Sequence, residues 1–220
     1  MRTRVSITVA VVAVAASAII ATATELPLGA STELATLLAD PEGLAAGDLD
    51  GDGLLDLVVT VPGHAYVSWL EGNGAGFEAP VWIDTGVQGV RRAQIADIDD
   101  DGDADVVLAA STADELYWIA NVAGDASAWT DRTVDGDGLS GAWDLAVADV
   151  NRDGDLDVVA IGASRLAWYE SDGAAPPAFT EREITGLPAT PGGVAVGDID
   201  RDGDLDVVVA GDDVVSWWAS

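Results

Sequence analysis

Aspartate residues recur in this chain at spacings that suit a bound cation. Four segments share the pattern Asp-x-Asp/Asn-x-Asp-Gly-x-x-Asp, with oxygen-bearing side chains at positions 1, 3, 5 and 9 and glycine at position 6. When such a chain curls, the side chains of positions 1, 3 and 5 converge on one point and position 7 turns its backbone carbonyl toward it. The side chain of position 9 then completes the coordination shell of the cation. The candidate ligands of the four loops, in chain order, are Asp48, Asp50, Asp52, Leu54 and Asp56; Asp97, Asp99, Asp101, Asp103 and Asp105; Asp149, Asn151, Asp153, Asp155 and Asp157; and Asp198, Asp200, Asp202, Asp204 and Asp206.

These ligands favour calcium, with up to four ions per chain. Calcium takes six to eight oxygen ligands, whereas magnesium keeps more of its water and zinc prefers nitrogen or sulfur. The alternative is a set of acidic turns solvated by water, in which the crowded carboxylates would repel one another. Charge count predicts the tightest site in the second loop, where Asp100 adds an acid, and the weakest in the third, where Asn151 and Arg152 reduce the negative charge.

An EF-hand begins in the same way but requires a bidentate glutamate at position 12 and flanking helices. Position 12 is apolar in all four loops, being Val59, Leu108, Ala160 and Val209. The sequence therefore argues against an EF-hand and its dockerin variant.

The loops must be positioned by a repeat of about 50 residues. Each unit offers four short β-branched or aromatic stretches separated by turn residues, which predicts four antiparallel strands and no helix. One strand leads into the loop, the second leaves it, the third carries a tryptophan and the fourth follows a turn. This is an all-β propeller blade. The expected fourth strands are Phe77–Ile83, Trp129–Val134 and Phe179–Ile184, and the tryptophans expected to pack between blades are Trp69, Trp118, Trp168 and Trp217.

The last unit stops after its third strand, and residues 32–38 before the first loop read as an unpaired strand. That strand could complete the last blade and close a ring of four blades. Alternatively, the four blades belong to a larger propeller that a second copy or further sequence completes.

The segments Asp198-Ile-Asp-Arg-Asp-Gly-Asp-Leu-Asp-Val-Val-Val-Ala210 and Leu166-Ala-Trp-Tyr-Glu170 resemble the FG-GAP and VCBS repeats of integrin-type propellers. The resemblance covers nearly all of the chain from residue 24 onward. It implies calcium in the loops and extracellular binding or adhesion roles. The chain departs from the family in its count of four repeats and in lacking a recognisable Phe-Gly…Gly-Ala-Pro segment, to which Gly76-Phe-Glu-Ala-Pro80 comes nearest.

Composition limits the partners. The 220 residues carry a formal charge of −30, and the chain contains no lysine and no cysteine. Nucleic acid and anionic membranes are polyanions that this charge would repel. The absence of cysteine excludes disulfides and thiolate chemistry. If the domain is exported, we expect bound calcium to stabilise its fold in place of disulfides.

Residues 1–23 read as a secretory signal peptide, and residues 24–220 as the propeller domain. Arg2 and Arg4 precede the apolar run Val5–Ile20, and Ala21-Thr22-Ala23 suits a signal peptidase. The alternative is an uncleaved anchor helix, because the run approaches the length of a membrane span. The predicted location is outside the cell or at its surface, with no membrane contact beyond this segment.

Ligand candidates lie on the connections opposite the calcium loops, since loops on a rigid scaffold often carry binding. They are His64, Arg91, Arg92, Trp143 and Asp144. No catalytic constellation is recognisable, because the single histidine lacks a nucleophile and an orienting acid in a matching motif. We therefore expect a binding or adhesion module for a glycan or protein. The alternatives are a polysaccharide lyase or hydrolase, for which paired carboxylates abound, and a structural repeat of a larger assembly, including one formed by self-association.

Overall fold

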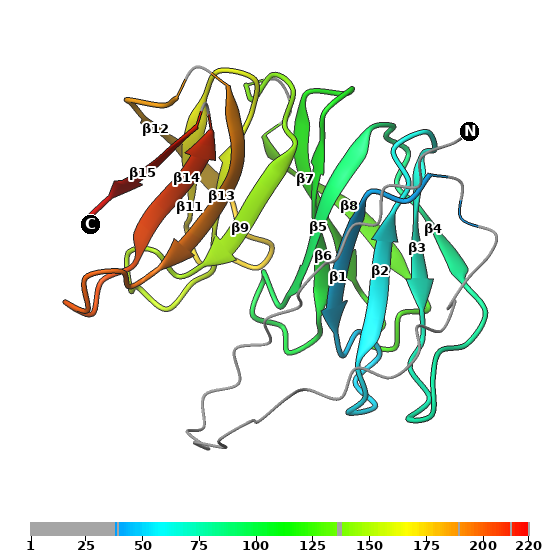
Figure 1. Cartoon of the computed structure of the whole chain (residues 1–220). Helices are drawn as coiled ribbons and strands as arrows, with labels where there is room; N and C mark the ends of the chain where they lie inside the picture. The colour runs from blue at the N-terminus through cyan, green and yellow to red at the C-terminus, as the bar shows by residue number, and fades with distance from the viewer. Residues whose placement is uncertain (1–37, 39, 136–137, 189, 212, 220) are drawn as a thin grey trace, which may run out of the picture.

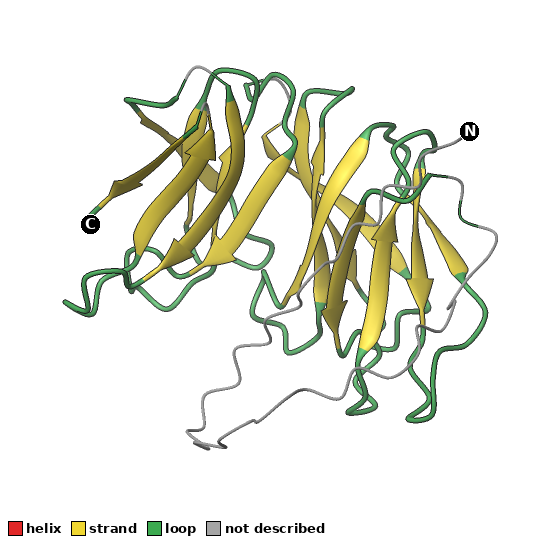
Figure 2. Ribbon diagram, in the orientation of Figure 1, coloured by secondary structure: helices red, strands yellow, loops and turns green. Residues whose placement is uncertain are grey.

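All regular structure in the described part of the chain is β-strand. The computed structural model describes residues 38, 40–135, 138–188, 190–211 and 213–219. Their strands form four small antiparallel sheets (Figures 1 and 2), which are the four blades of a β-propeller. These ranges contain no helix, and so none of the length and apolar character that a membrane span requires. The all-β propeller predicted from the repeat is confirmed. The proposed signal peptide lies outside the described residues.

The first three blades each have four strands paired in chain order. Blade 1 consists of β1 (Gly43–Gly47), β2 (Asp56–Thr60), β3 (Tyr66–Leu70) and β4 (Val81–Asp84). Blade 2 consists of β5 (Val90–Ala96), β6 (Asp105–Ala110), β7 (Glu115–Asn121) and β8 (Trp129–Asp135). Blade 3 consists of β9 (Asp144–Ala148), β10 (Asp157–Ile161), β11 (Leu166–Ser171) and β12 (Phe179–Ile184).

Blade 4 has three strands in the described residues: β13 (Pro191–Gly197), β14 (Asp206–Gly211) and β15 (Val214–Trp218). The blades contact one another in chain order through their first strands, from β1 to β5, β9 and β13. Blades 1 and 4 lie at opposite ends of this row (Figure 1), and no comparable contact joins them among the described strands. The described strands thus do not form the closed ring. Residues 32–38, expected to complete blade 4, fall outside the described residues except for Leu38, which is in no strand.

The fourth strand of blade 1 is shorter than the sequence indicates. It begins at Val81 instead of Phe77, and Phe77 forms only an isolated bridge with Gly72. Pro80 precedes the strand and has no N–H to contribute to a ladder. The predicted fourth strands of blades 2 and 3 are present as β8 and β12.

The core consists of three apolar clusters, one at each junction between successive blades. Position 2 of each of the first three Asp loops inserts into the junction that follows its blade, whereas Ile199 at position 2 of the fourth loop is 55% exposed. Leu49 packs in the cluster between blades 1 and 2, and Ile98 in the cluster between blades 2 and 3. Trp69, Trp118 and Trp168 also pack in these junctions, as the repeat predicts. The same prediction is wrong for Trp217, which is 47% exposed and belongs to none of the three clusters, because no described blade covers that side of blade 4. The first three loops therefore contribute to the packing of their blades against the next one.

We predict that Leu49→Ala destabilises the fold by about 2–5 kcal/mol, because Leu49 is completely buried and its truncation leaves a cavity. Leu55→Ala makes the same chemical change at a side chain that is 59% exposed, and should change the free energy of unfolding by less than about 0.5 kcal/mol. Urea denaturation in the presence of calcium measures both variants. Equal losses would contradict the packing role of position 2.

Candidate metal centre and ligand face

The four Asp loops lie on one side of the propeller, at the lower edge in Figure 1, where each joins the first strand of a blade to the second. Their backbone turns at two positions. Glycine at position 6 has φ between +87° and +102°, and position 4 is also left-handed, with φ of +75° at Gly51 and +54° at Asp100. The sequence predicted the first of these turns and missed the second, because position 4 is not restricted to glycine.

Backbone N–H groups orient the loop carboxylates. In the first loop, Asp48 Oδ2 accepts from Gly53 N at 2.9 Å, Asp50 Oδ1 from Asp52 N at 3.1 Å, and Asp52 Oδ1 from Leu54 N at 2.8 Å. The position 5 carboxylates of the other loops accept from position 7 in the same way. These bonds curl the chain so that side chains separated by two residues point inward.

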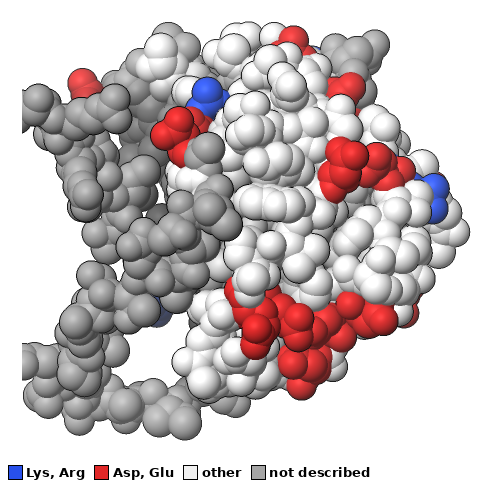
Figure 3. Space-filling model, turned by 90° about the vertical axis from the view of Figure 1, so that its right-hand side faces the viewer, with Lys and Arg blue, Asp and Glu red and all other residues white. Residues whose placement is uncertain are grey.

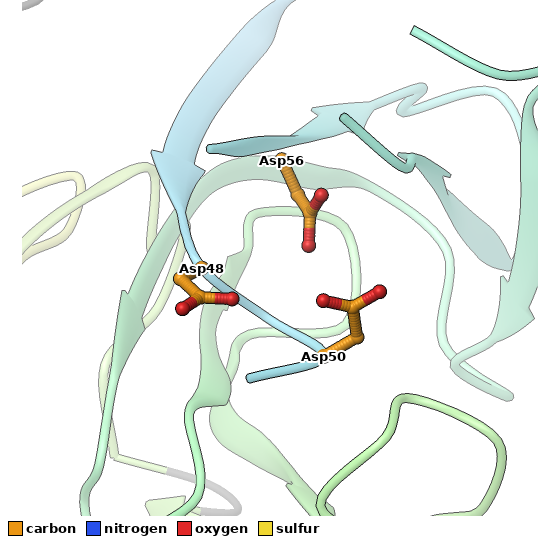
Figure 4. Close-up of side chains that lie close together, drawn as sticks. All are labelled: Asp48, Asp50 and Asp56. Atoms are coloured by element: carbon orange, nitrogen blue, oxygen red, sulfur yellow. The ribbon is translucent and has the colours of Figure 1, made fainter. Parts of the chain in front are cut away.

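Three loops gather carboxylates closely enough to share a cation. In each, one oxygen from each of three acids lies within 4.8 Å of the others; the groups are Asp48, Asp50 and Asp56; Asp97, Asp99 and Asp101; and Asp198, Asp200 and Asp206. Figure 4 shows the first group, with its three carboxylates directed toward a common point. Acidic side chains crowd the same edge of the molecule in the space-filling view (Figure 3).

The residues present fit a calcium ion. Asp48 Oδ1 and Asp99 Oδ1 are buried without a hydrogen-bond partner, so each has an acceptor directed at no protein donor. Loss of hydration raises the pKa of the Asp99 carboxyl, and the charges of Asp101 and Asp97 raise it further. A divalent cation bound between these oxygens would supply the missing partner and offset the repulsion.

The position 9 aspartates have a second, structural role. Asp56 is fully buried, and its two carboxylate oxygens accept from Leu49 N at 3.0 Å and Gly72 N at 2.7 Å. Asp105 makes the corresponding bonds to Ile98 N and Asn121 N, and burial raises the pKa of its carboxyl to about 7. Because a carboxylate has about four acceptor positions, these bonds leave capacity for a metal. The buried aspartate thus ties the loop to the end of the third strand.

The third loop differs from the others. Its acids form no such three-carboxylate group in the described part of the chain. Asn151 occupies position 3, and its Nδ2 donates to Asp153 Oδ2 at 2.8 Å and to Glu170 Oε1 at 3.2 Å. Arg152 crosses to Asp204 of the fourth loop at 2.7 Å. The prediction that the third site is the weakest rests on these fewer carboxylates and on the nearby arginine.

Two further acids adjoin the loops and were missed from the sequence. Glu71 and Glu170 each lie two residues after the repeat tryptophan. Desolvation raises the pKa of Glu71, followed by the charges of Asp50 and Asp56, which places it beside the first loop. Glu170 accepts from Asn151 in the third. Aligning the third strands of the repeats would have shown these two acids in register.

The structure brings four of the five predicted ligand residues together on the side opposite the Asp loops. A cavity of about 330 Å³ contains Arg91 and Trp143, and an adjoining cavity of about 160 Å³ shares both. We call the two together the ligand groove; its described lining is Glu42, Arg91, Arg92, Ser111, Gly141, Trp143, Asp144, Ala163, Thr190, Pro191 and Gly192. His64 lines neither cavity and instead stacks on Tyr66 with ring centres 4.8 Å apart.

The charged groups of the ligand groove are paired. Arg91 contacts Glu42 at 2.5 Å and donates to Ser111 Oγ at 2.8 Å. Arg92 pairs with Asp144 at 2.7 Å, and the other oxygen of Asp144 accepts from Val194 N of blade 4 at 2.9 Å. These contacts join the first strands of blades 2, 3 and 4 and give the groove a rigid wall. The sequence did not reveal Glu42, Ser111 or Thr190 as lining residues, because they come from different blades.

Fold and loops together define a β-propeller built from Asp-loop repeats. A model of the FG-GAP-like repeat matches three overlapping stretches, residues 48–108, 97–160 and 149–209. The chain belongs to the FG-GAP-like repeat family. Comparison with curated protein sequences gives no match.

Several solved structures are similar to this chain over about three quarters of its length. An Agrocybe aegerita lectin that recognises non-reducing terminal N-acetylglucosamine has a TM-score of 0.53 at 20% identity, over 74% of this chain and 46% of the lectin. The Photorhabdus luminescens Tc holotoxin pore has a TM-score of 0.50 at 16% identity, over 79% of this chain and 9% of the holotoxin chain. The V. cholerae biofilm matrix protein Bap1 has a TM-score of 0.45 at 24% identity, over 76% of this chain and 23% of Bap1. This chain thus spans less than half the length of each.

We predict that removing calcium lowers the melting temperature of the protein. If chelation removes about 4 kcal/mol, which is what one site supplies at a thousandfold excess of ligand, the midpoint should fall by roughly 8–16 °C. Calorimetry with excess chelator measures the shift, and added calcium should reverse it where magnesium does not. A melting curve unaffected by chelation would show that the loops need no ion.

We also predict that Asn151→Asp strengthens the third site by about tenfold, because it restores a carboxylate at position 3. Without calcium the same change should lower the melting temperature, since it removes two hydrogen bonds from Nδ2 and adds a charge beside Asp153 and Glu170. Titration calorimetry and thermal melts measure the two effects. Four equal sites in the parent protein, or an unchanged affinity in the variant, would contradict this order.

Proposed function

We propose that this chain is an exported, calcium-stabilised binding module that takes a glycan or protein ligand in the ligand groove. Calcium in the Asp loops holds the blades together on one side, and the loops of the other side form the binding surface. The observation that carries the proposal is the groove itself, where Trp143 stands 37% exposed among paired charges and small polar groups.

The chemistry of the groove suits a neutral or weakly charged ligand. Its arginines already have acidic partners, so they offer their remaining N–H groups as hydrogen-bond donors more than as free charge. Trp143 provides a flat apolar surface for a sugar ring or an apolar side chain. A cavity of about 330 Å³ is at the small end of ligand sites, which suits one or two sugar rings or a protein side chain.

The comparison with the Agrocybe aegerita lectin supports a binding role at the level of the fold. That protein recognises a terminal sugar on a propeller of related architecture. The export proposed here is supported by residues 1–23, whose two arginines, apolar run and Ala-Thr-Ala end are typical of a secretory signal peptide.

We predict that Trp143→Ala weakens ligand binding by about tenfold or more, because it removes the exposed ring from the groove. The ligand is first found on glycan and protein arrays with calcium present, and its affinity is then measured by titration. Trp82→Ala is the matched control, since Trp82 is 43% exposed on β4 and does not line the groove.

An array without any binding in calcium would contradict the proposed function. A ligand that binds both variants equally would place the site elsewhere on the protein. Release of products from a panel of polysaccharides would replace a binding module by an enzyme.

A further inference from the structure

One position of the repeat brings a residue from every blade into the ligand groove. This position directly precedes the first-strand residue that pairs with the fifth residue of the second strand. In blade order it is occupied by Glu42, Arg91, Trp143 and Gly192, and all four line the smaller of the two cavities. The hydrogen bonds agree in blades 1 and 3, where Glu42 N donates to Thr60 O at 3.0 Å and Trp143 N to Ile161 O at 3.1 Å.

The residues at this groove position are unlike one another, although the blades are alike elsewhere. The residue two positions after the buried aspartate, for example, is valine in all four blades: Val58, Val107, Val159 and Val208. The groove position carries instead an acid, a base, an aromatic ring and a glycine. Blades that pack in the same way need similar residues for packing, so packing does not explain these four differences. A ligand that touches all four residues does, because binding sites combine an apolar surface with a few placed polar groups.

A β-bulge adds a second arginine to the smaller cavity. Arg91 is the extra residue of a bulge in β5, between the paired residues Val90 and Arg92. Side chains alternate between the two faces of a regular strand, and a bulge breaks that alternation. Two successive arginines, Arg91 and Arg92, therefore line the same cavity. Blade 4 has a bulge at the same place, but its extra residue is Gly192, which adds no side chain.

Arg91 and Glu42 place a hydrogen-bond donor and an acceptor side by side. Their contact at 2.5 Å and the bond from Arg91 Nε to Ser111 Oγ use two of the five N–H groups of the guanidinium. The two side chains are 43% and 45% exposed, so a ligand can reach both. A hydroxyl group can donate and accept at the same time. Two neighbouring hydroxyls of a sugar can therefore accept from Arg91 and donate to Glu42 together.

Trp143 supplies the apolar part of the site. It lines both cavities and is 37% exposed. Its neighbours in the chain, Ala142 and Asp144, are 0% and 8% exposed, so the backbone that carries the ring is held in the protein. The flat face of an indole suits the C–H groups on one face of a sugar ring. Ala163 and Pro191 continue this apolar surface in the larger cavity.

The charges of the smaller cavity sum to zero. Its two arginines are matched by Glu42 and Asp144. An acidic sugar would leave water without gaining a net opposite charge, which is costly. It would also be repelled by the chain, whose formal charge is −30. The groove therefore favours an uncharged ligand over an acidic one.

We propose that the ligand groove binds a single uncharged pyranose unit of a glycan, with Trp143 against one face of the sugar ring and the Arg91–Glu42 pair on two neighbouring hydroxyls. The inference rests on the proposed function of the groove and names the class of its ligand. A pyranose combines a flat apolar face with neighbouring hydroxyls in one rigid ring, which is the combination that the groove position of the four blades offers.

The test titrates the full chain, with calcium present, with the methyl glycosides of glucose, galactose, mannose and N-acetylglucosamine. We expect at least one of them to bind with a dissociation constant of about 1–10 mM, as measured by ligand-observed NMR or calorimetry. The uronic acid of the same configuration should bind at least about tenfold more weakly. Deoxy analogues that lack either of two neighbouring hydroxyls should also lose about tenfold, because a charged partner in the groove is then left unpaired.

A variant tests the pair from the protein side. Glu42→Gln should weaken the best sugar by about tenfold, because it replaces the charged acceptor beside Arg91 by an amide of the same shape. Glu183→Gln is the matched control, since Glu183 is exposed on β12 and lines neither cavity. The melting temperature in calcium shows that both variants fold, and the deoxy analogues test the same contact on the parent protein.

Three results would overturn the inference. One is the absence of binding by all four glycosides at up to about 20 mM, and another is tighter binding of the uronic acid. The third is a set of deoxy analogues that bind as tightly as the parent sugar. A protein ligand whose binding depends on Trp143 would overturn the inference and leave the proposed binding function in place, whereas arrays without any ligand would overturn both.

Discussion

The buried aspartate at position 9 of each loop is the interaction on which the blades depend. Asp56, Asp105, Asp157 and Asp206 start the second strand of their blades and are almost fully buried, and each accepts the N–H of the residue at position 2. In the first three blades this bond holds position 2 where its side chain enters the next junction. Burying a carboxylate is costly unless its oxygens have partners. Backbone donors supply part of that requirement, and a bound cation would supply the rest.

The protein has two surfaces of different chemical character, the edge that carries the Asp loops and the opposite side that carries the ligand groove. Acids and their turns occupy one edge, where the carboxylates repel one another and a bound cation would offset that repulsion. On the opposite side, Arg91 and Arg92 are neutralised by Glu42 and Asp144, and the same contacts connect successive blades. Because the wall of the ligand groove is made by strands that also form the core, its shape follows from the blade packing. A ligand in the groove would therefore meet a preformed surface.

Much of the architecture was predictable because its signals are local. Oxygen donors two residues apart, followed by glycine, specify a curled loop whatever surrounds it, and the run of consecutive apolar, largely β-branched residues after the loop specifies the strand. The fourth strand of blade 1 was predicted to begin at Phe77, but it begins at Val81. The prediction was wrong because Pro80 has no N–H to donate to the neighbouring strand, so the strand pairing does not extend back to Phe77. Glu71, Glu170 and the groove residues Glu42 and Ser111 were missed because their roles arise from segments that meet only in the folded chain.

The sequence by itself determined the repeat, the four loops and most of the strands of each blade, and it predicted calcium as the cation that suits the loops. Only the tertiary structure decided which equivalent residues are buried. Leu49 and Ile199 hold the same position in the same motif, yet one is fully buried and the other is 55% exposed. The physical reason is that burial belongs to the contact between blades, since a side chain leaves water only if a second surface covers it. The repeated sequence specifies the same strands and loop in each blade. Equivalent residues nevertheless differ in burial, because the blades have different neighbours in the folded chain.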